Sequence, residues 1–217
     1  MPNREIRAVF WDFGGVMTES PFVAFRRFER DHGLPDNFLR SINTRNPDNN
    51  VWARFERSEL TPEQFDVSFA EESATAGHPV RGLDVIDLLY GAIRPRMVAA
   101  VKACKAHWLN ACLTNNVDAG PGRGFARDPL RAREWQNAIE IFDRVLESSK
   151  LGSRKPERRF FELACEKIGI EPKQAVFLDD LGANLKPARA MGMHTIKVDA
   201  PDQALAQLET LLDWKLQ

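Results

Sequence analysis

The chain has 217 residues, 43% of them hydrophobic, and its 30 Lys and Arg residues nearly balance its 31 Asp and Glu residues. A near-neutral chain offers no electrostatic footprint for a nucleic-acid backbone, so no nucleic-acid partner is expected. No apolar run in the sequence approaches the roughly 20 residues of a membrane-spanning helix, so no membrane partner is expected either.

The N-terminal residues and the cysteines indicate a cellular compartment. The first residues (MPNREIRAVFWDF) are charged and lack the long apolar stretch of a signal peptide. Cys104, Cys112 and Cys165 form no Cys-x-x-Cys pair, so neither a zinc site nor a disulfide framework is indicated. These features predict a cytoplasmic protein with reduced cysteines. They do not indicate an oligomeric state, and a homodimer stays an open alternative.

The first predicted strand spans residues 6–11 (IRAVFW), a short apolar run that two glycines follow closely. A helix is predicted to begin at Pro21, because proline suits the first helical position. Residues 61–64 (TPEQ) match a capping box, which starts another helix. The stretch from about residue 17 to residue 93 is therefore predicted to be helical, and its pattern indicates no strand.

From residue 94 onward, apolar strand-like runs alternate with helix-start signals. The predicted elements are a helix opening at Pro95, a strand at 108–114, a short strand at 145–147, a helix opening at Pro156, a strand at 175–178, a helix at 184–191, a strand at 195–198 and a helix from about 202. Such alternation predicts a parallel sheet covered on both faces. We therefore expect an α/β fold, with a Rossmann-like core of residues 1–16 and 94–217 and an inserted α-helical cap of residues 17–93.

Polar side chains follow the predicted strands or stand at a helix start. They are Asp12 after the first strand, Thr114 and Asn115 after the second, Lys155 before the helix at Pro156, and Asp179, Asp180 and Asn184 after the strand at 175–178. In an open α/β sheet, ligands bind beyond the carboxyl ends of the strands. The sequence therefore predicts that these side chains meet at one edge of the sheet.

These residue types suit phosphoryl transfer. A carboxylate such as Asp12 can attack phosphorus and form an aspartyl-phosphate. The acidic pair at 179–180 can join Asp12 in holding Mg²⁺, which prefers oxygen ligands and bridges to phosphate. The hydroxyl of Thr114, the amide of Asn115 and the ammonium of Lys155 can hold the phosphate oxygens.

The order of these motifs resembles the haloacid dehalogenase-like superfamily, with a nucleophilic Asp, a Ser or Thr, a Lys and an acidic pair at successive element ends. Within this superfamily, the chain resembles the N-terminal phosphatase domain of soluble epoxide hydrolases. The similar stretches are LTNN at 113–116, LESSKLGSRKPE at 146–157 and VFLDDLGANLKPARAMG at 176–192.

The resemblance implies a nucleophile and a metal site. Asp12 would be the nucleophile. Asp12, Asp180 and the main-chain carbonyl of Gly14 would bind Mg²⁺. Asp179 and Asn184 would support this metal shell from behind.

The resemblance also implies the substrate contacts. Thr114 and Asn115 would bind the phosphate, and Lys155 would orient both the phosphate and Asp12. A Mg²⁺-dependent phosphohydrolase that acts on a small phosphorylated metabolite through an aspartyl-phosphate at Asp12 is therefore expected.

Gly14 departs from the superfamily pattern, which usually has a second Asp there to protonate the leaving group. Loss of a positioned general acid costs roughly 10²–10⁴-fold in rate. Glu19 and Asp118 are the candidates near in sequence that could replace it. Otherwise the leaving group must need little help, or catalysis must be weak.

Two alternatives remain open at this stage. A 2-haloacid dehalogenase also uses an Asp nucleophile, but it needs no metal, so the pair Asp179 and Asp180 would lack a purpose. A phosphate-binding module with little catalysis would account for Gly14. The acidic pair favours a phosphatase over a dehalogenase.

Overall fold

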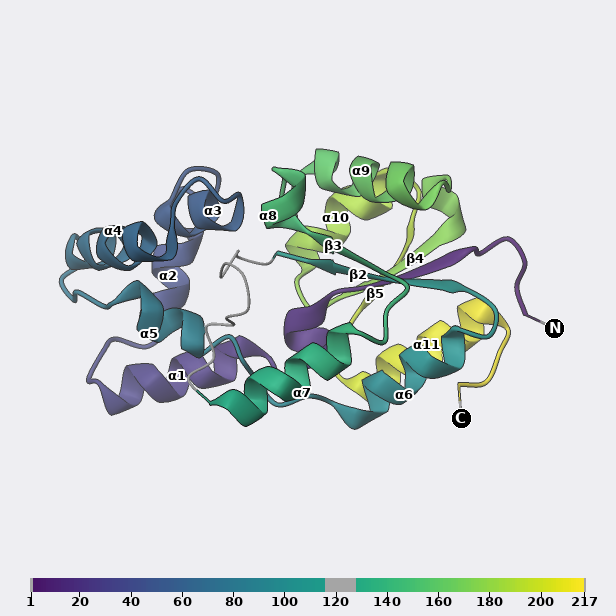
Figure 1. The fold of residues 1–217 in the computed structure, drawn as a ribbon, viewed down its shortest axis with the longest axis horizontal. Helices are drawn as coiled ribbons and strands as arrows, with labels where there is room; N and C mark the ends of the chain where they lie inside the picture. The colour runs from purple at the N-terminus through teal and green to yellow at the C-terminus, as the bar shows by residue number, and fades with distance from the viewer. Residues whose placement is uncertain (1, 116–127, 217) are drawn as a thin grey trace.

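A computed structural model of the chain describes residues 2–115 and 128–216. Its centre is a sheet of five parallel strands in the order β3-β2-β1-β4-β5, with helices on both faces (Figure 1). The predicted α/β fold with a Rossmann-like parallel sheet is confirmed. The strands are β1 (Ala8–Trp11), β2 (Leu109–Thr114), β3 (Arg144–Glu147), β4 (Ala175–Asp179) and β5 (His194–Lys197).

Two helical layers bury the sheet. The helices α6 (Pro95–Cys104), α7 (Pro129–Ile139) and α11 (Pro201–Leu212) cover one face, and α8 (Ser148–Leu151), α9 (Arg158–Ile168) and α10 (Gly182–Ala190) lie on the other side (Figure 1). Successive side chains of a strand point to opposite faces. In β1, Val9 and Trp11 accordingly join one apolar cluster, while Ala8 and Phe10 join the other. Burial on both faces explains why the central strands β1 and β4 read as continuous apolar runs.

A block of five helices follows β1 and lies beside the sheet (Figure 1). These helices are α1 (Pro21–Asp31), α2 (Phe38–Thr44), α3 (Val51–Glu56), α4 (Pro62–Ala74) and α5 (Gly82–Asp87). They surround an apolar cluster of their own that is rich in aromatic rings, including Phe55, Phe65 and Phe69. Thr61 and Gln64 form the expected capping box at the start of α4. We call α1–α5 the five-helix block; the assignment of residues 17–93 as a separate cap domain stays a prediction.

Two short segments join the five-helix block to the sheet, and they run side by side in opposite directions. The amide of Glu19 donates to the carbonyl of Ala92 at 2.9 Å, and that of Arg94 donates to Met17 at 2.8 Å. Between these bonds, Thr18 and Ile93 form an antiparallel bridge. The chain therefore leaves the sheet for the five-helix block and returns from it at one place, directly after β1.

The helix predicted to open at Pro156 begins two residues later. Helix α9 starts at Arg158, and a turn precedes it, in which the amide of Glu157 donates to the carbonyl of Arg154 at 2.8 Å. A residue before proline is biased away from helical backbone angles, which favours a turn at Lys155. The side chain of Lys155 thereby belongs to the sheet edge and not to a helix.

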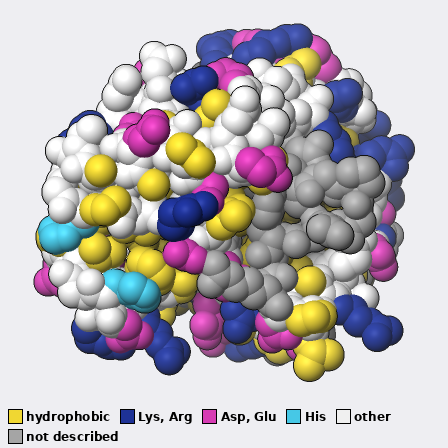
Figure 2. Space-filling model, turned by 60° about the vertical axis from the view of Figure 1, so that its left-hand side comes forward, with side chains coloured by type: hydrophobic (Ala, Val, Ile, Leu, Met, Phe, Trp, Pro, Cys, Tyr) yellow, Lys and Arg dark blue, Asp and Glu magenta, His cyan; other side chains and the backbone are white. Residues whose placement is uncertain are grey.

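The side of the molecule that carries the five-helix block shows mixed charges. In Figure 2, Lys and Arg side chains are interspersed with Asp and Glu among apolar side chains, and the described part of this face shows no large area of one sign. In the described residues, no helix combines the length and the apolar character that a membrane crossing requires.

Candidate active site

Strand register brings the predicted site residues to one edge of the sheet. Trp11 of β1 lies opposite Cys112 of β2 on one side and Leu178 of β4 on the other. The next residue, Asp12, donates its amide to the carbonyl of Leu178 at 2.9 Å. Because the chain continues from β1 to β2 on one side and returns to β4 on the other, this edge is a topological switch point, where ligands bind in open α/β sheets.

The ammonium group of Lys155 lies between two carboxylates. Its Nζ is 2.6 Å from Oδ1 of Asp12 and 2.9 Å from Oδ2 of Asp179. The Lys155 side chain is only 1% exposed. The amide of Phe13 also donates to Oδ1 of Asp12, at 2.7 Å. Two donors on one oxygen restrict the rotation of the Asp12 carboxylate, so this side chain is held in place before any ligand binds.

The pKa values at this edge reflect an excess of buried negative charge. Burial raises the pKa of Asp12 well above its ordinary value, and repulsion by Asp179 raises it further, against the attraction of Lys155. Burial and Asp179 raise the pKa of Asp180 to about 6. Burial alone would lower the pKa of Lys155, but Asp12 and Asp179 outweigh it and raise that pKa. Carboxyl groups shifted in this way are typical of functional sites.

Asp179 is the most firmly bonded carboxylate of the group. Asn184, near the start of α10, donates from Nδ2 to both of its oxygens at 3.0 Å. The amide of Leu181 donates to Oδ1 at 2.8 Å. With Lys155 added, Asp179 is held by three residues. Asn184 therefore contacts the site through Asp179, and its role in supporting a metal shell stays a prediction.

Three carboxylates at this edge suit a metal ion. Ligand atoms of Asp12, Asp179 and Asp180 all lie within 4.8 Å of one another. The three carry three negative charges when ionised. The ammonium of Lys155 offsets one of them, and Arg94 acts more weakly on Asp180, so negative charges remain in excess. A divalent cation would balance them, and carboxylate oxygens are the ligands that Mg²⁺ prefers. The donor set therefore fits Mg²⁺; the metal roles of Asp12, Asp180 and the Gly14 carbonyl stay predictions.

The two glycines after Asp12 have different surroundings. A Cβ atom built on Gly14 would meet no atom of the described residues within 4 Å. A Cβ on Gly15 would lie 2.2 Å from Oδ2 of Asp180, and Gly15 has a positive φ of 82°. Gly15 is thus required for the close approach of the loop to Asp180, a role that the sequence analysis missed although a glycine pair after a strand could have indicated it.

Thr114 ends β2 at the same edge, and Asn115 follows it. The Asn115 side chain is engaged with protein groups. Its Nδ2 donates to the carbonyl of Lys155 at 2.8 Å and to Oε2 of Glu56 at 3.3 Å, and its Oδ1 accepts from the amide of Lys155 at 2.8 Å. Both hydrogens of the amide are therefore used in this arrangement. If Asn115 binds phosphate as predicted, the contact falls to its main chain.

Of the two residues considered as replacements for the missing acid, Glu19 is exposed, and its main chain pairs with the returning segment at Ala92. Asp118 lies outside the described residues. Glu56, a buried carboxylate of the five-helix block, also reaches this edge, and it was not among the residues that the sequence indicated. Its helical surroundings carried no signal of that contact.

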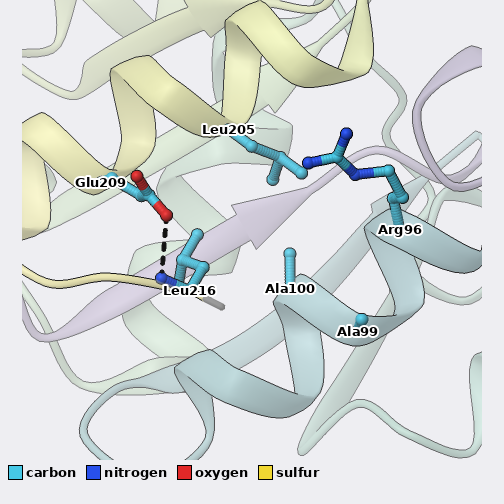
Figure 3. Close-up of a pocket in the computed structure, with 6 residues that line it drawn as sticks. All are labelled: Arg96, Ala99, Ala100, Leu205, Glu209 and Leu216. Carbon is cyan, nitrogen blue, oxygen red and sulfur yellow. Dashed lines mark hydrogen bonds between the residues drawn. The ribbon is translucent and has the colours of Figure 1, made fainter.

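A cavity of about 200 Å³ lies away from this edge, between α6 and α11 (Figure 3). It is lined by Arg96, Ala99, Ala100, Leu205, Glu209 and Leu216. Its charged groups already have partners, because Arg96 pairs with Asp202 and Glu209 accepts from the amide of Leu216. The cavity therefore offers no reactive group, and the carboxylate cluster at the sheet edge is the candidate site.

Comparison with protein families identifies relatives over nearly the whole chain. The family model described as haloacid dehalogenase-like hydrolase matches residues 6–192. Acyl-CoA dehydrogenase family member 10 of Mus musculus is 35% identical over 99% of this chain. Bifunctional epoxide hydrolase 2 of Sus scrofa is 30% identical over 94% of this chain. The chain spans only 20% and 38% of the length of these two relatives.

Two further proteins match along most of both chains. Validoxylamine A 7'-phosphate phosphatase of Streptomyces hygroscopicus subsp. limoneus is 26% identical over 95% of this chain and 92% of its own length. The solved structure of a predicted HAD-like family hydrolase from Porphyromonas gingivalis has a TM-score of 0.67 and 21% identity, and covers 95% of this chain and 98% of its own. The resemblance that the motifs indicated is therefore confirmed at the level of family and fold.

Proposed function

The chain belongs to the haloacid dehalogenase-like hydrolases, and we propose that it is a Mg²⁺-dependent phosphatase that forms an aspartyl-phosphate at Asp12. The observation that carries the proposal is the group of Asp12, Lys155 and Asp179, all buried, with the half-buried Asp180 beside them. Its surplus negative charge, with one ammonium at its centre, suits a site that receives a divalent cation together with a phosphate ester.

Asp12 would attack phosphorus, forming the bond between its carboxylate oxygen and phosphorus while the bond from phosphorus to the ester oxygen breaks. Lys155 and the amide of Phe13 hold the Asp12 carboxylate for this step. The positive charge of Lys155 also lowers the repulsion between an anionic nucleophile and an anionic phosphate. Water would then attack phosphorus of the aspartyl-phosphate, which releases inorganic phosphate and restores Asp12.

When bound, Mg²⁺ would offset the charge of the phosphate oxygens and help to align the ester. Asp180 and Asp12 are the side chains that would hold it. Asp179, which Asn184 fixes, would keep the ammonium of Lys155 in place. Thr114, at the end of β2, would donate to a phosphate oxygen. The position of these residues at the carboxyl edge of the sheet supports these assignments.

Gly14 sets the class of substrate that this site handles well. Without an acid at that position, the departing oxygen must leave with little protonation. An acyl, anomeric or aryl phosphate meets this condition better than a simple alkyl phosphate. We infer that the substrate is a small phosphorylated metabolite with a good leaving group.

Dehalogenation is less well supported. A dehalogenase of this fold needs no metal, and the paired carboxylates of Asp179 and Asp180 would then raise each other's energy without a function. The phosphatase named among the relatives matches along most of both chains, which supports a phosphate ester as the substrate.

A panel of phosphorylated metabolites and aryl phosphates, assayed for released phosphate with Mg²⁺ and with a chelator, tests the proposal. We expect Mg²⁺-dependent release from at least the aryl and acyl members. Release of halide from 2-haloacids without metal, with no phosphate release from any member, would overturn it.

A further inference from the structure

Glu56 connects the five-helix block to the candidate active site. It is the last residue of α3 and is only 6% exposed. Its Oε1 accepts from the indole nitrogen of Trp52 at 3.0 Å, within its own helix. Its Oε2 accepts from Nε of Arg154 and, at 3.3 Å, from Nδ2 of Asn115. One carboxylate thus joins a helix of the block to two residues beside the proposed phosphate site.

Glu56 reinforces the orientation of the Asn115 amide that the main chain of Lys155 sets. The Asn115 amide bonds twice to the main chain of Lys155, as donor to the carbonyl and as acceptor from the amide, each at 2.8 Å. A flipped amide would place its NH₂ group against the Lys155 N–H and its oxygen against Oε2 of Glu56. Two donors or two acceptors facing each other repel. Glu56 therefore stabilises the one orientation in which Asn115 clamps Lys155.

Arg154, which precedes Lys155, provides a second contact between Glu56 and this segment. The guanidinium of Arg154 is bound by Glu56 and also donates from Nη1 to the carbonyl of Pro47 at 3.0 Å. Arg154 and Lys155 are adjacent, so the chain is fixed through a side chain at one residue and through the main chain at the next. This segment carries the ammonium that lies between Asp12 and Asp179.

The environment of Glu56 fits an acceptor and not a proton donor to substrate. Burial raises its pKa, but Arg154 and the indole of Trp52 act in the opposite direction. Both carboxylate oxygens accept hydrogen bonds from protein donors. A group engaged in this way has no proton to give to a leaving group.

We propose that Glu56 is a positioning residue of the active site, which acts through Asn115 and Arg154 on Lys155. The five-helix block thereby helps to position Lys155 in the active site. The expected effect on hydrolysis rests on the proposed function. The positioning role itself can be tested by phosphate binding alone.

The test compares Glu56→Gln with wild type in steady-state hydrolysis of an aryl phosphate and in calorimetric binding of inorganic phosphate with Mg²⁺ present. Loss of a supporting residue of this kind costs about 10- to 100-fold. We expect kcat/KM to fall by about that factor and phosphate affinity to fall with it. Glu59→Gln is the matched control, because Glu59 is a half-exposed carboxylate of the same region that pairs with Arg57 at 2.6 Å. It should match wild type in both measurements.

A double-mutant cycle tests the route of the effect. If Glu56 acts through Asn115, adding Glu56→Gln to Asn115→Ala should cause less further loss than Glu56→Gln causes alone. Glu56→Asp provides a second variant, should the glutamine variant fail to fold. It keeps a charge near Arg154 but withdraws the carboxylate from Asn115, and we expect weaker phosphate binding.

The positioning role would be overturned if folded Glu56→Gln or Glu56→Asp differed from wild type only by a lower Tm. Phosphate affinity and kcat/KM would then lie within twofold of wild type. If wild type hydrolyses no phosphate ester, the proposed function fails, and phosphate binding by the variants still decides the role of Glu56. The two inferences can therefore fail separately.

Discussion

Buried carboxylates serve different purposes at the sheet edge and in the five-helix block. In the block, Asp66 accepts from the amide of Leu83 at 3.0 Å and pairs with Arg81, whose hydrogen bond lowers the pKa of Asp66. At the sheet edge, Asp12 and Asp180 lie near a third carboxylate, and their pKa values are raised. Asp66 is thus stabilised in its charged form by donors, whereas the charged forms of Asp12 and Asp180 are disfavoured by burial and by Asp179.

This contrast indicates that the carboxylates at the sheet edge lower the stability of the fold, whereas Asp66 raises it. A carboxylate that completes a neighbouring helix start stabilises the fold, and its loss should lower stability. Carboxylates that crowd together destabilise the metal-free fold and suit a cation or a reacting group. Glu56 lies in the block but has a raised pKa, like the residues of the edge. Burial of its carboxylate is the main cause of that shift.

The largest expected effect is at Asp12. Asp12→Asn keeps the shape of the side chain but removes the nucleophile, so hydrolysis should fall on the order of 10⁴-fold or more. The same change removes repulsion with Asp179, and the Tm of the metal-free protein at pH 7 should equal or exceed that of wild type. Phosphate-release assays and thermal denaturation measure the two. A folded Asp12→Asn protein with wild-type turnover would exclude Asp12 from the mechanism.

Gly14 offers a gain of activity. Because a Cβ at this position meets none of the described atoms within 4 Å, Gly14→Asp should fold and can supply the absent acid. We expect alkyl phosphates to gain most, by up to roughly 10²–10⁴-fold, and aryl phosphates with acidic leaving groups to gain little. The measurement is a series of phosphates with graded leaving-group pKa.

Wild type should show a steep dependence on leaving-group pKa in that series, and Gly14→Asp a shallower one. A flat wild-type dependence, with chemistry rate-limiting, would mean that another group already donates the proton. Gly15→Ala is the contrasting variant. Its Cβ would collide with Asp180, so it should lose activity.

Asp180→Asn tests the metal assignment. Removing this charge should weaken Mg²⁺ binding at least as much as the loss of an outer-shell partner does, about 10- to 100-fold. Calorimetric titration of Mg²⁺ provides the comparison. Asp202→Asn, on the surface helix α11, is the control and should bind Mg²⁺ like wild type. Equal affinity in Asp180→Asn and wild type would reject Asp180 as a ligand.

In the five-helix block, Asp66→Asn should have the opposite profile to Asp12→Asn. It removes the charged acceptor of Arg81 and of the Leu83 amide, so the free energy of unfolding should fall by about 1–3 kcal/mol. Activity of the folded variant should not change. Chemical denaturation and phosphate release measure the two, and a stabilised or inactive Asp66→Asn would contradict the contrast between the regions.

The smallest expected effect is a pH dependence of stability. The folded pKa of Asp180 is about 6 against 3.8 for the ordinary group, so the folded state binds this proton more tightly than the unfolded chain. The contribution of Asp180 to the free energy of unfolding is therefore largest below about pH 4, and it is lost as the pH rises through 6. Metal-free Asp180→Asn should gain in Tm relative to wild type over that range. A difference independent of pH would contradict the shift.

Much of the sheet and its edge could be predicted from the sequence. Strands buried on both faces read as apolar runs, and residues directly after such runs, such as Asp12 and Asp179, must lie at the carboxyl edge. The position of Lys155 was also predictable, although the helix after it begins at Arg158 and not at Pro156. The local pattern could not indicate how the turn before that helix closes.

Contacts between the two regions could not be predicted. Helical periodicity indicates which face of α3 is apolar, but not where its last residue docks, so Glu56 carried no signal. Asn115 was expected to hold phosphate through its amide, whereas that amide clamps Lys155. Both facts depend on how distant segments pack, which a single sequence does not specify.

The central claim is that Asp12 becomes phosphorylated during turnover, and chemical trapping tests it most directly. The protein is mixed with Mg²⁺ and an aryl phosphate, quenched with borohydride during turnover, digested and analysed by mass spectrometry. Borohydride reduces an aspartyl-phosphate to homoserine, so the account predicts homoserine at position 12, dependent on both substrate and Mg²⁺. Trapped product at another residue, with residue 12 still aspartate while phosphate is released, would contradict it.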